Sequence, residues 1–79
     1  MSIIEKGKRQ FISKPFGNSA EIEALAMRAY PGAEKTQGYR LCCYADYDDG
    51  LLYHCSCYET YEKAYKAMME ISCGQWEEV

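Results

Sequence analysis

Residues 39–58 constrain the fold of this chain more than any other segment, because two strand-like runs flank a strong turn signal. The segment reads YRLCCYADYDDGLLYHCSCY, and Tyr, Leu and Cys dominate both runs. Asp48-Asp49-Gly50 fits a three-residue hairpin loop in which Gly50 takes the left-handed position of a type I turn followed by a bulge. The sequence therefore predicts a β-hairpin over residues 39–58.

The loop length sets the register of the hairpin, and the register decides which face each side chain occupies. A three-residue loop pairs Cys43 with Cys55 and keeps every charged residue off one face. We expect that face to be the core side, made of Leu41, Cys43, Ala45, Tyr47, Leu51, Tyr53, Cys55 and Cys57. The outer face then carries Arg40, Cys42, Tyr44, Asp46, Leu52, His54, Ser56 and Tyr58. A two-residue loop would move Asp46 to the face of Leu51 and Tyr53, so the longer loop is favoured.

A first helix is predicted at residues 19–30, within the stretch GNSAEIEALAMRAYPG. Asn18 is a suitable N-cap, and Glu21 falls where a capping box places Glu. The Pro-Gly pair that follows ends the segment. Apolar residues recur at helical spacing, namely Ile22, Leu25, Ala26 and Ala29.

A second helix is predicted at residues 60–73, with Thr60 as its N-cap and Gly74 just beyond its end. In the tail, residues 74–79, we expect Trp76 to fold back over the last helical turn while two glutamates stay in solvent. The inward stripe is expected to be Tyr61, Ala64, Tyr65, Met68, Ile71 and Ser72.

The remaining segment, residues 1–16, contains one short strand candidate, Arg9–Ser13. With 79 residues the chain forms one domain, residues 1–79, which buries only about 60% of its unfolded surface. We therefore predict a small α+β domain of β-α-β-β-α order. Its antiparallel sheet of two or three strands would carry both helices on one face.

Charge is unevenly distributed along the chain, whose formal net charge is −3. Residues 1–14 carry four Lys or Arg and one Glu, a net +3, whereas residues 15–79 carry five Lys or Arg and eleven acidic residues, a net −6. A body of that sign disfavours general nucleic-acid binding. The first residues lack the apolar run of a signal peptide, so we expect a cytoplasmic protein with reduced thiols.

The cysteines and the single histidine offer metal and catalytic alternatives. Cys43, Cys55, Cys57 and Cys73 could cluster around zinc, but no CxxC occurs, and buried cysteines acting as small hydrophobes are commoner. Cys42 and His54 could meet diagonally on the outer face, although nothing orients the imidazole and no glycine-rich turn supplies an oxyanion hole. We expect neither metal, cofactor nor enzymatic activity.

The predicted element order resembles that of double-stranded-RNA-binding domains, which keeps RNA binding as a lesser alternative. That family opens its second helix with a lysine cluster that grips phosphates. The corresponding stretch here is ETYEKAYK, with Glu59 and Glu62 near its start. The departure weakens the electrostatic term that RNA binding needs.

Protein binding is the function that the outer hairpin face favours, because tyrosine and arginine are enriched at interfaces. The predicted partner-binding residues are Arg40, Tyr44, Asp46, Asp48, Asp49, Leu52, His54 and Tyr58. With Glu59 and Glu62 nearby, we expect them to dock on a larger, basic protein and to occlude it.

In gross properties, namely small size, acidity, many tyrosines and acidic loops, the chain resembles the inhibitors that phages and mobile elements encode against host defence, such as anti-CRISPR proteins. The resemblance implies an inhibitor without catalytic activity. The alternative is a homodimeric scaffold protein that associates through the outer face or an unpaired strand edge. A strict monomer at micromolar concentration would weigh against the scaffold.

Overall fold

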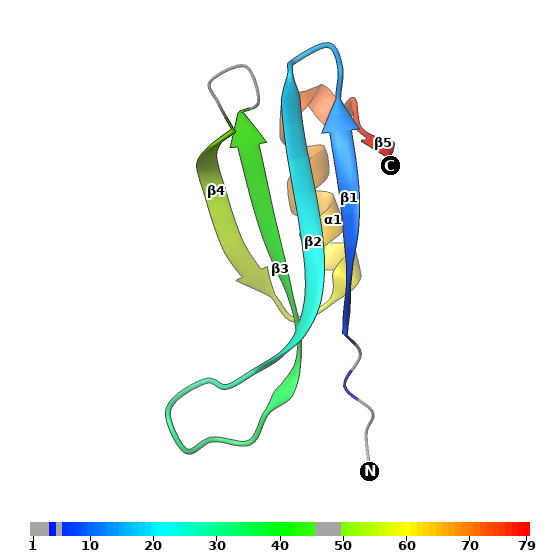
Figure 1. Cartoon of the computed structure of the whole chain (residues 1–79). Coiled ribbons are helices and arrows are strands. Elements are labelled where there is room, and N and C mark those ends of the chain that lie inside the picture. The colour runs from blue at the N-terminus through cyan, green and yellow to red at the C-terminus, as the bar shows by residue number, and fades with distance from the viewer. Residues whose placement is uncertain (1–3, 5, 46–49) are drawn as a thin grey trace.

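A computed structural model describes residues 4, 6–45 and 50–79 of the chain. Within these residues, one antiparallel sheet is covered on one face by one α-helix (Figure 1). The spatial order of the strands is β4-β3-β2-β1-β5. The elements are β1 (Gly7–Ser13), β2 (Asn18–Met27), β3 (Thr36–Ala45), β4 (Leu51–Tyr58), α1 (Tyr61–Met69), the 3₁₀-helix η2 (Ser72–Gly74) and β5 (Glu77–Glu78).

The predicted β-α-β-β-α order is wrong, because the segment predicted as the first helix is strand β2. Residues 20–24 alternate strictly between small or apolar and acidic side chains, which also suits a strand buried on one side. β2 pairs with β1 on one side and with all of β3 on the other. These two ladders satisfy its backbone and override the helical preference of Ala, Glu and Leu. The likeness to double-stranded-RNA-binding domains, which rested on element order, is lost with this correction.

The predicted hairpin exists as β3 and β4, and Gly50 has the expected left-handed backbone, with φ of 74°. Its register differs from the prediction. Cys42 lies opposite Cys55, and a shift next to Cys43 leaves Tyr53 as the extra residue of a β-bulge in β4. Side chains that precede the bulge have the predicted faces, and those after it are reversed. The predicted turn residues 46–49 lie outside the described residues.

α1 confirms the predicted N-cap, since Thr60 accepts a hydrogen bond from the Lys63 N–H at 3.2 Å. The helix ends at Met69, earlier than the predicted residue 73, and η2 follows it. Trp76 folds back as expected, and its Nε1–H donates to the carbonyl oxygens of Met68 at 2.9 Å and Ile71 at 3.0 Å. This anchor directs the tail across the sheet, where β5 pairs with β1.

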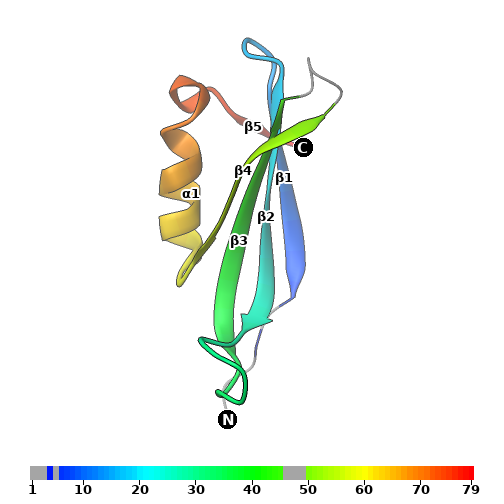
Figure 2. The same ribbon diagram turned by 90° about the vertical axis from the view of Figure 1, so that its left-hand side faces the viewer.

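The hydrophobic core lies between α1 and the sheet (Figure 2). Ala64 and Met68 of α1 are fully buried against it. Ala20 of β2 is buried in the same cluster. The buried core residues are Phe11, Ala20, Ile22, Leu41, Cys43, Ala64 and Met68.

Candidate functional site

The face of the sheet opposite α1 carries no covering element among the described residues, as Figure 2 shows. Side chains alternate along a strand, so the residues between the buried ones point to this side. The strand register arranges them in three rows across β1 to β4. We call this surface the open face: Lys8, Gln10, Ile12, Ser19, Glu21, Glu23, Arg40, Cys42, Tyr44, Leu52, Cys55 and Cys57.

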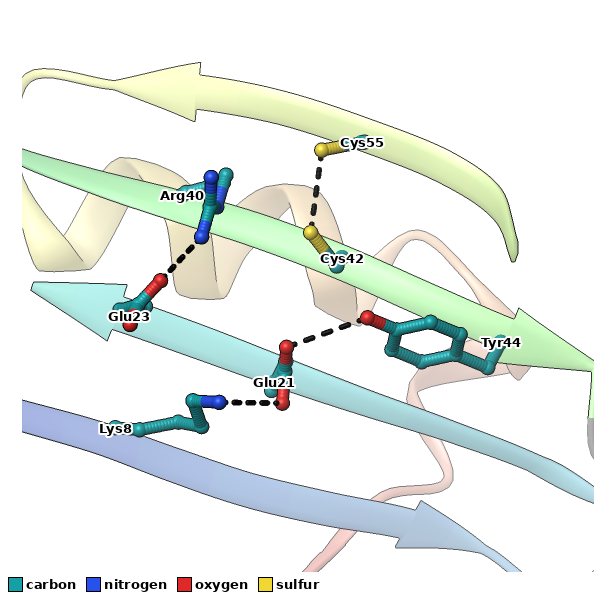
Figure 3. A network of polar contacts seen from close by, with 7 residues as sticks. All are labelled: Lys8, Glu21, Glu23, Arg40, Cys42, Tyr44 and Cys55. Atoms are coloured by element: carbon teal, nitrogen blue, oxygen red, sulfur yellow. Dashed lines mark hydrogen bonds and ion pairs between the residues drawn. The ribbon is translucent and has the colours of Figure 1, made fainter. Parts of the chain in front are cut away.

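The middle of the open face is a network of paired charges (Figure 3). Glu21 forms an ion pair with Lys8 at 3.4 Å and accepts a hydrogen bond from the Tyr44 hydroxyl at 3.3 Å. Glu23 is paired with Arg40, and this contact raises the pKa of the guanidinium. Both carboxylates are therefore neutralised by neighbouring strands, which leaves them little capacity to bind a new cation.

The β4 side of the open face is built from thiols instead of charges. The sulfur atoms of Cys42 and Cys55 lie 3.1 Å apart across the β3–β4 ladder (Figure 3). Burial, and then the hydrogen bond to Cys55, raise the pKa of Cys42 to about 11. Cys57 follows on the same side of β4 and is exposed. At neutral pH the Cys42 side chain is thus a neutral thiol, and it lies beside the exposed thiol of Cys55.

The two edges of the sheet differ in chemistry. On the outer side of β1, residues 10–12 are covered by the tail, through the β5 pairing and a hydrogen bond from the Val79 N–H to the Gln10 carbonyl at 2.9 Å. On its outer side, β4 pairs with no strand in the described part of the chain. Its eight residues, LLYHCSCY, include no Lys, Arg, Asp, Glu or Pro. β4 is therefore an uncharged edge with backbone groups available for pairing.

An apolar hollow lies beside the start of β4, between the sheet and the end of α1. Leu51 and Tyr53 of β4 and Phe16 of the β1–β2 turn line it, and each is more than 40% exposed. Ile71 lies at its far side. Large hydrophobic side chains gathered in this way are typical of contact surfaces.

The structure divides the predicted partner-binding residues into three groups. Arg40, Tyr44 and Leu52 lie on the open face, as expected. The prediction that His54 and Tyr58 share this face is wrong, because both follow the bulge and lie on the helix side. Tyr58 packs against the core, and His54 Nε2 is buried without a hydrogen-bond partner in the described chain. The predicted residues Asp46, Asp48 and Asp49 lie outside the described residues.

The same bulge separates the residues that the zinc-binding and catalytic alternatives require to be close together. Cys43 is fully buried on the helix side, whereas Cys55 and Cys57 lie on the open face, so the zinc cluster considered as an alternative does not form. Across the described ranges, no group of three or more His, Cys, Asp or Glu side chains could hold a metal ion. Cys42 and His54 occupy opposite faces, which separates the suggested catalytic pair.

Sequence reasoning missed the contribution of β1 and β2 to the site. The sequence predicts a strand only from Arg9 onward in the first segment and a helix over residues 19–30, so it gives Lys8, Glu21 and Glu23 no place on the open face. The signal that could have found them is the alternation at residues 20–24, in which the two glutamates share one side.

Comparisons with known proteins assign no family to this chain: no family model, no curated protein and no solved structure matches it. None of the helices described here is long and apolar enough to cross a membrane.

Proposed function

We propose that this chain is a protein-binding module that accepts a strand of its partner along β4, extending the sheet by one strand. The observation that carries the proposal is the uncharged edge of β4, which no strand of the described residues covers. Proteins usually guard such edges with lysine, proline or a covering segment, because an open edge pairs readily with another chain. An edge left without these guards is suited to strand addition.

Backbone hydrogen bonds would supply part of the binding energy, and side chains would supply the selection. Each new backbone hydrogen bond contributes about 0.5–1.5 kcal/mol net. Leu52 presents an apolar side chain on the open face, and the hollow at Phe16, Leu51 and Tyr53 can receive a large side chain from the partner. A strand with an apolar residue near the start of β4 fits both features.

Charge around β4 indicates the chemistry of that partner strand. Residues 41–62 contain five acidic residues and no Lys or Arg. Three of them precede β4 in the sequence, and Glu59 follows it directly. A partner strand with an uncharged centre and Lys or Arg on both flanks would therefore be favoured, in agreement with a larger, basic partner.

Self-pairing of β4 is the second candidate, and the same charges disfavour it. In an antiparallel pair of two β4 strands, the acidic stretch before one strand approaches Glu59 of the other. Like charges brought together in this way lower the affinity. The homodimeric scaffold is therefore the weaker proposal, and light scattering should find a monomer at micromolar concentration.

Occlusion is the mechanism that strand addition provides, since the partner's own strand becomes covered by β4. In the proposed setting, a cytoplasmic inhibitor of a host-defence protein, covering that strand would block its normal contacts. No catalytic step is required for this effect.

A synthetic peptide can test the proposal without knowledge of the partner. The probe alternates valine and threonine and carries lysines on both flanks, and its control carries glutamates there. We expect the lysine peptide to bind and the Leu52→Lys variant to weaken that binding by about tenfold or more, because it adds a charge to the edge. The matched variant Gln10→Lys adds the same charge at the opposite edge of the same face and should bind as the wild type does. Equal loss in both variants, or preference for the glutamate peptide, would refute the proposal.

A further inference from the structure

We propose that Cys42 and Cys55 are a modification site, at which a small-molecule disulfide such as oxidised glutathione converts two thiols into a reversible disulfide between β3 and β4. The inference goes beyond the proposed function, because it concerns the covalent state of the chain and requires no partner. It rests on the placement of these two sulfur atoms.

The geometry of the pair meets the requirements of a disulfide. Cys42 and Cys55 are direct partners in the antiparallel β3–β4 ladder. Directly opposite residues in such a ladder have Cα atoms about 4.5–5.5 Å apart, within the roughly 4.4–6.8 Å range that disulfides span. Their sulfur atoms are in contact at 3.1 Å on the open face. Bond formation therefore needs side-chain rotation and a small approach, without a change of register.

The other three cysteines lack such a partner position. Cys43 is fully buried on the helix side, where its register partner is His54. Cys57 lies opposite Arg40. Cys73 belongs to η2 and lines the hollow near the start of β4. Among the five cysteines, the register thus selects one pair.

The exposure of the two thiols assigns the order of the steps. Cys55 is exposed, whereas Cys42 is 7% exposed, so a soluble disulfide reaches Cys55 first. The Cys55 thiolate attacks one sulfur of the small disulfide, forms a mixed disulfide and releases one thiolate. Cys42 then attacks the Cys55 sulfur, which breaks the mixed disulfide and releases the second small thiolate. The two protein thiols give up two protons and two electrons, which the two released small thiols carry away.

Two features favour completion of the second step. The sulfur of Cys42 already lies against that of Cys55, so the mixed disulfide forms next to its attacker. Arg40 lies on the neighbouring row of the open face and attracts negative charge on Cys42 as it forms. The product links β4, the strand that the proposed function uses, covalently to β3.

The test exposes the reduced full-length chain to glutathione buffers of increasing oxidised fraction, followed by acid quenching, alkylation and peptide mass mapping. We expect the wild type to lose the mass of two hydrogens through a link between Cys42 and Cys55, and to regain it with excess reduced glutathione. The matched variant Cys57→Ser should behave identically. Cys42→Ser should instead retain one glutathionyl group on Cys55.

Three results would overturn the inference. They are a link that uses Cys57 in place of Cys42, a glutathionyl group that persists on Cys55 of the wild type, and no modification of Cys55 in excess oxidised glutathione. Circular dichroism of Cys42→Ser checks that the variant folds, and the Cys57→Ser result stands independently of it. No partner or peptide is present in the assay, so its outcome is separate from that of the strand-addition proposal.

Discussion

The two edges of this sheet are built in opposite ways. The β1 edge carries Lys8 and Arg9, and the tail lies along part of it, with β5 held by ion pairs from Arg9 to Glu78 and from Lys14 to Glu77. The β4 edge is longer than the covered part of β1, carries no charge and is uncovered by any described residue. Within the described residues, the β1 edge is therefore protected by charge, strand pairing and the folded-back tail, whereas the β4 edge has none of these.

The difference indicates where a partner binds. A sheet whose edges were both unguarded would polymerise, whereas one guarded edge limits strand addition to a single side. The open face supports the same assignment, because its charges are paired near β1 and β2 while its β4 side presents Leu52 and thiols. The following predictions change one edge at a time.

The largest expected effect is on the β4 edge, through the disulfide between Cys42 and Cys55. It closes a loop of 14 residues, from Cys42 to Cys55, which corresponds to a gain of about 3 kcal/mol in the free energy of unfolding. Urea denaturation of the oxidised and reduced Cys57→Ser variant measures the gain. A loss of stability on oxidation would mean that the ladder is strained by the link.

An effect of intermediate size is expected on the β1 edge, through the anchor of the tail. Trp76→Phe removes the donor to the Met68 and Ile71 carbonyls and should lower the free energy of unfolding by about 1–2 kcal/mol. The Val79 amide, which is bonded to Gln10, should then exchange faster with solvent. The control Glu78→Gln removes only an exposed ion pair and should cost less than about 0.5 kcal/mol. A larger cost for Glu78→Gln would make charge, and not the tryptophan, the main support of β5.

A pair of cysteine substitutions tests the β3–β4 register on which the β4 edge is defined. Cys43→Ser places a hydroxyl in the fully buried core and should cost about 1–3 kcal/mol. Cys55→Ser changes an exposed side chain and should stay within about 0.5 kcal/mol. Thermal unfolding compares the two under reducing conditions. A cost for Cys55→Ser as large as that for Cys43→Ser would instead support the register expected from a three-residue loop, which places both cysteines on the core side.

The smallest expected effect on folding is that of Leu52→Lys. Leu52 is 49% exposed, so the free energy of unfolding should change by no more than about 0.5 kcal/mol. Because the variant should keep nearly the stability of the wild type, a loss of peptide binding can be attributed to the altered β4 edge and not to unfolding. A loss of several kcal/mol would show that Leu52 belongs to a packed layer.

The sequence predicted those elements whose signals are local. The hairpin, the left-handed Gly50, the Thr60 cap and the return of Trp76 all depend on residues close to one another in the chain. Residues 18–27 could not be assigned in this way, because their pattern contains both a helical stripe and a strand alternation. Pairing with β1 and β3 decides between them, and that pairing is a long-range property.

The faces of the candidate site's side chains were predicted correctly on β3, whereas on β4 they are reversed after the bulge. Residues 40–45 of β3 have the predicted faces, including Arg40 and Tyr44. On β4 the bulge at Tyr53 shifts every later residue by one, which moved His54 inward and Cys55 outward. A bulge of this kind has no sequence signature comparable to Asp-Gly in a turn. The predicted face is therefore right for Leu52, which precedes the bulge, and wrong for Tyr58, which follows it.

The most direct test of the β4 edge is hydrogen exchange with and without the lysine-flanked valine–threonine peptide. Strand addition predicts that backbone amides of residues 51–58 become slower to exchange on binding, while those of residues 7–13 keep their rates. Protection that appears at β1, or binding that slows no amide in β4, would contradict the assignment of β4 as the partner-binding strand.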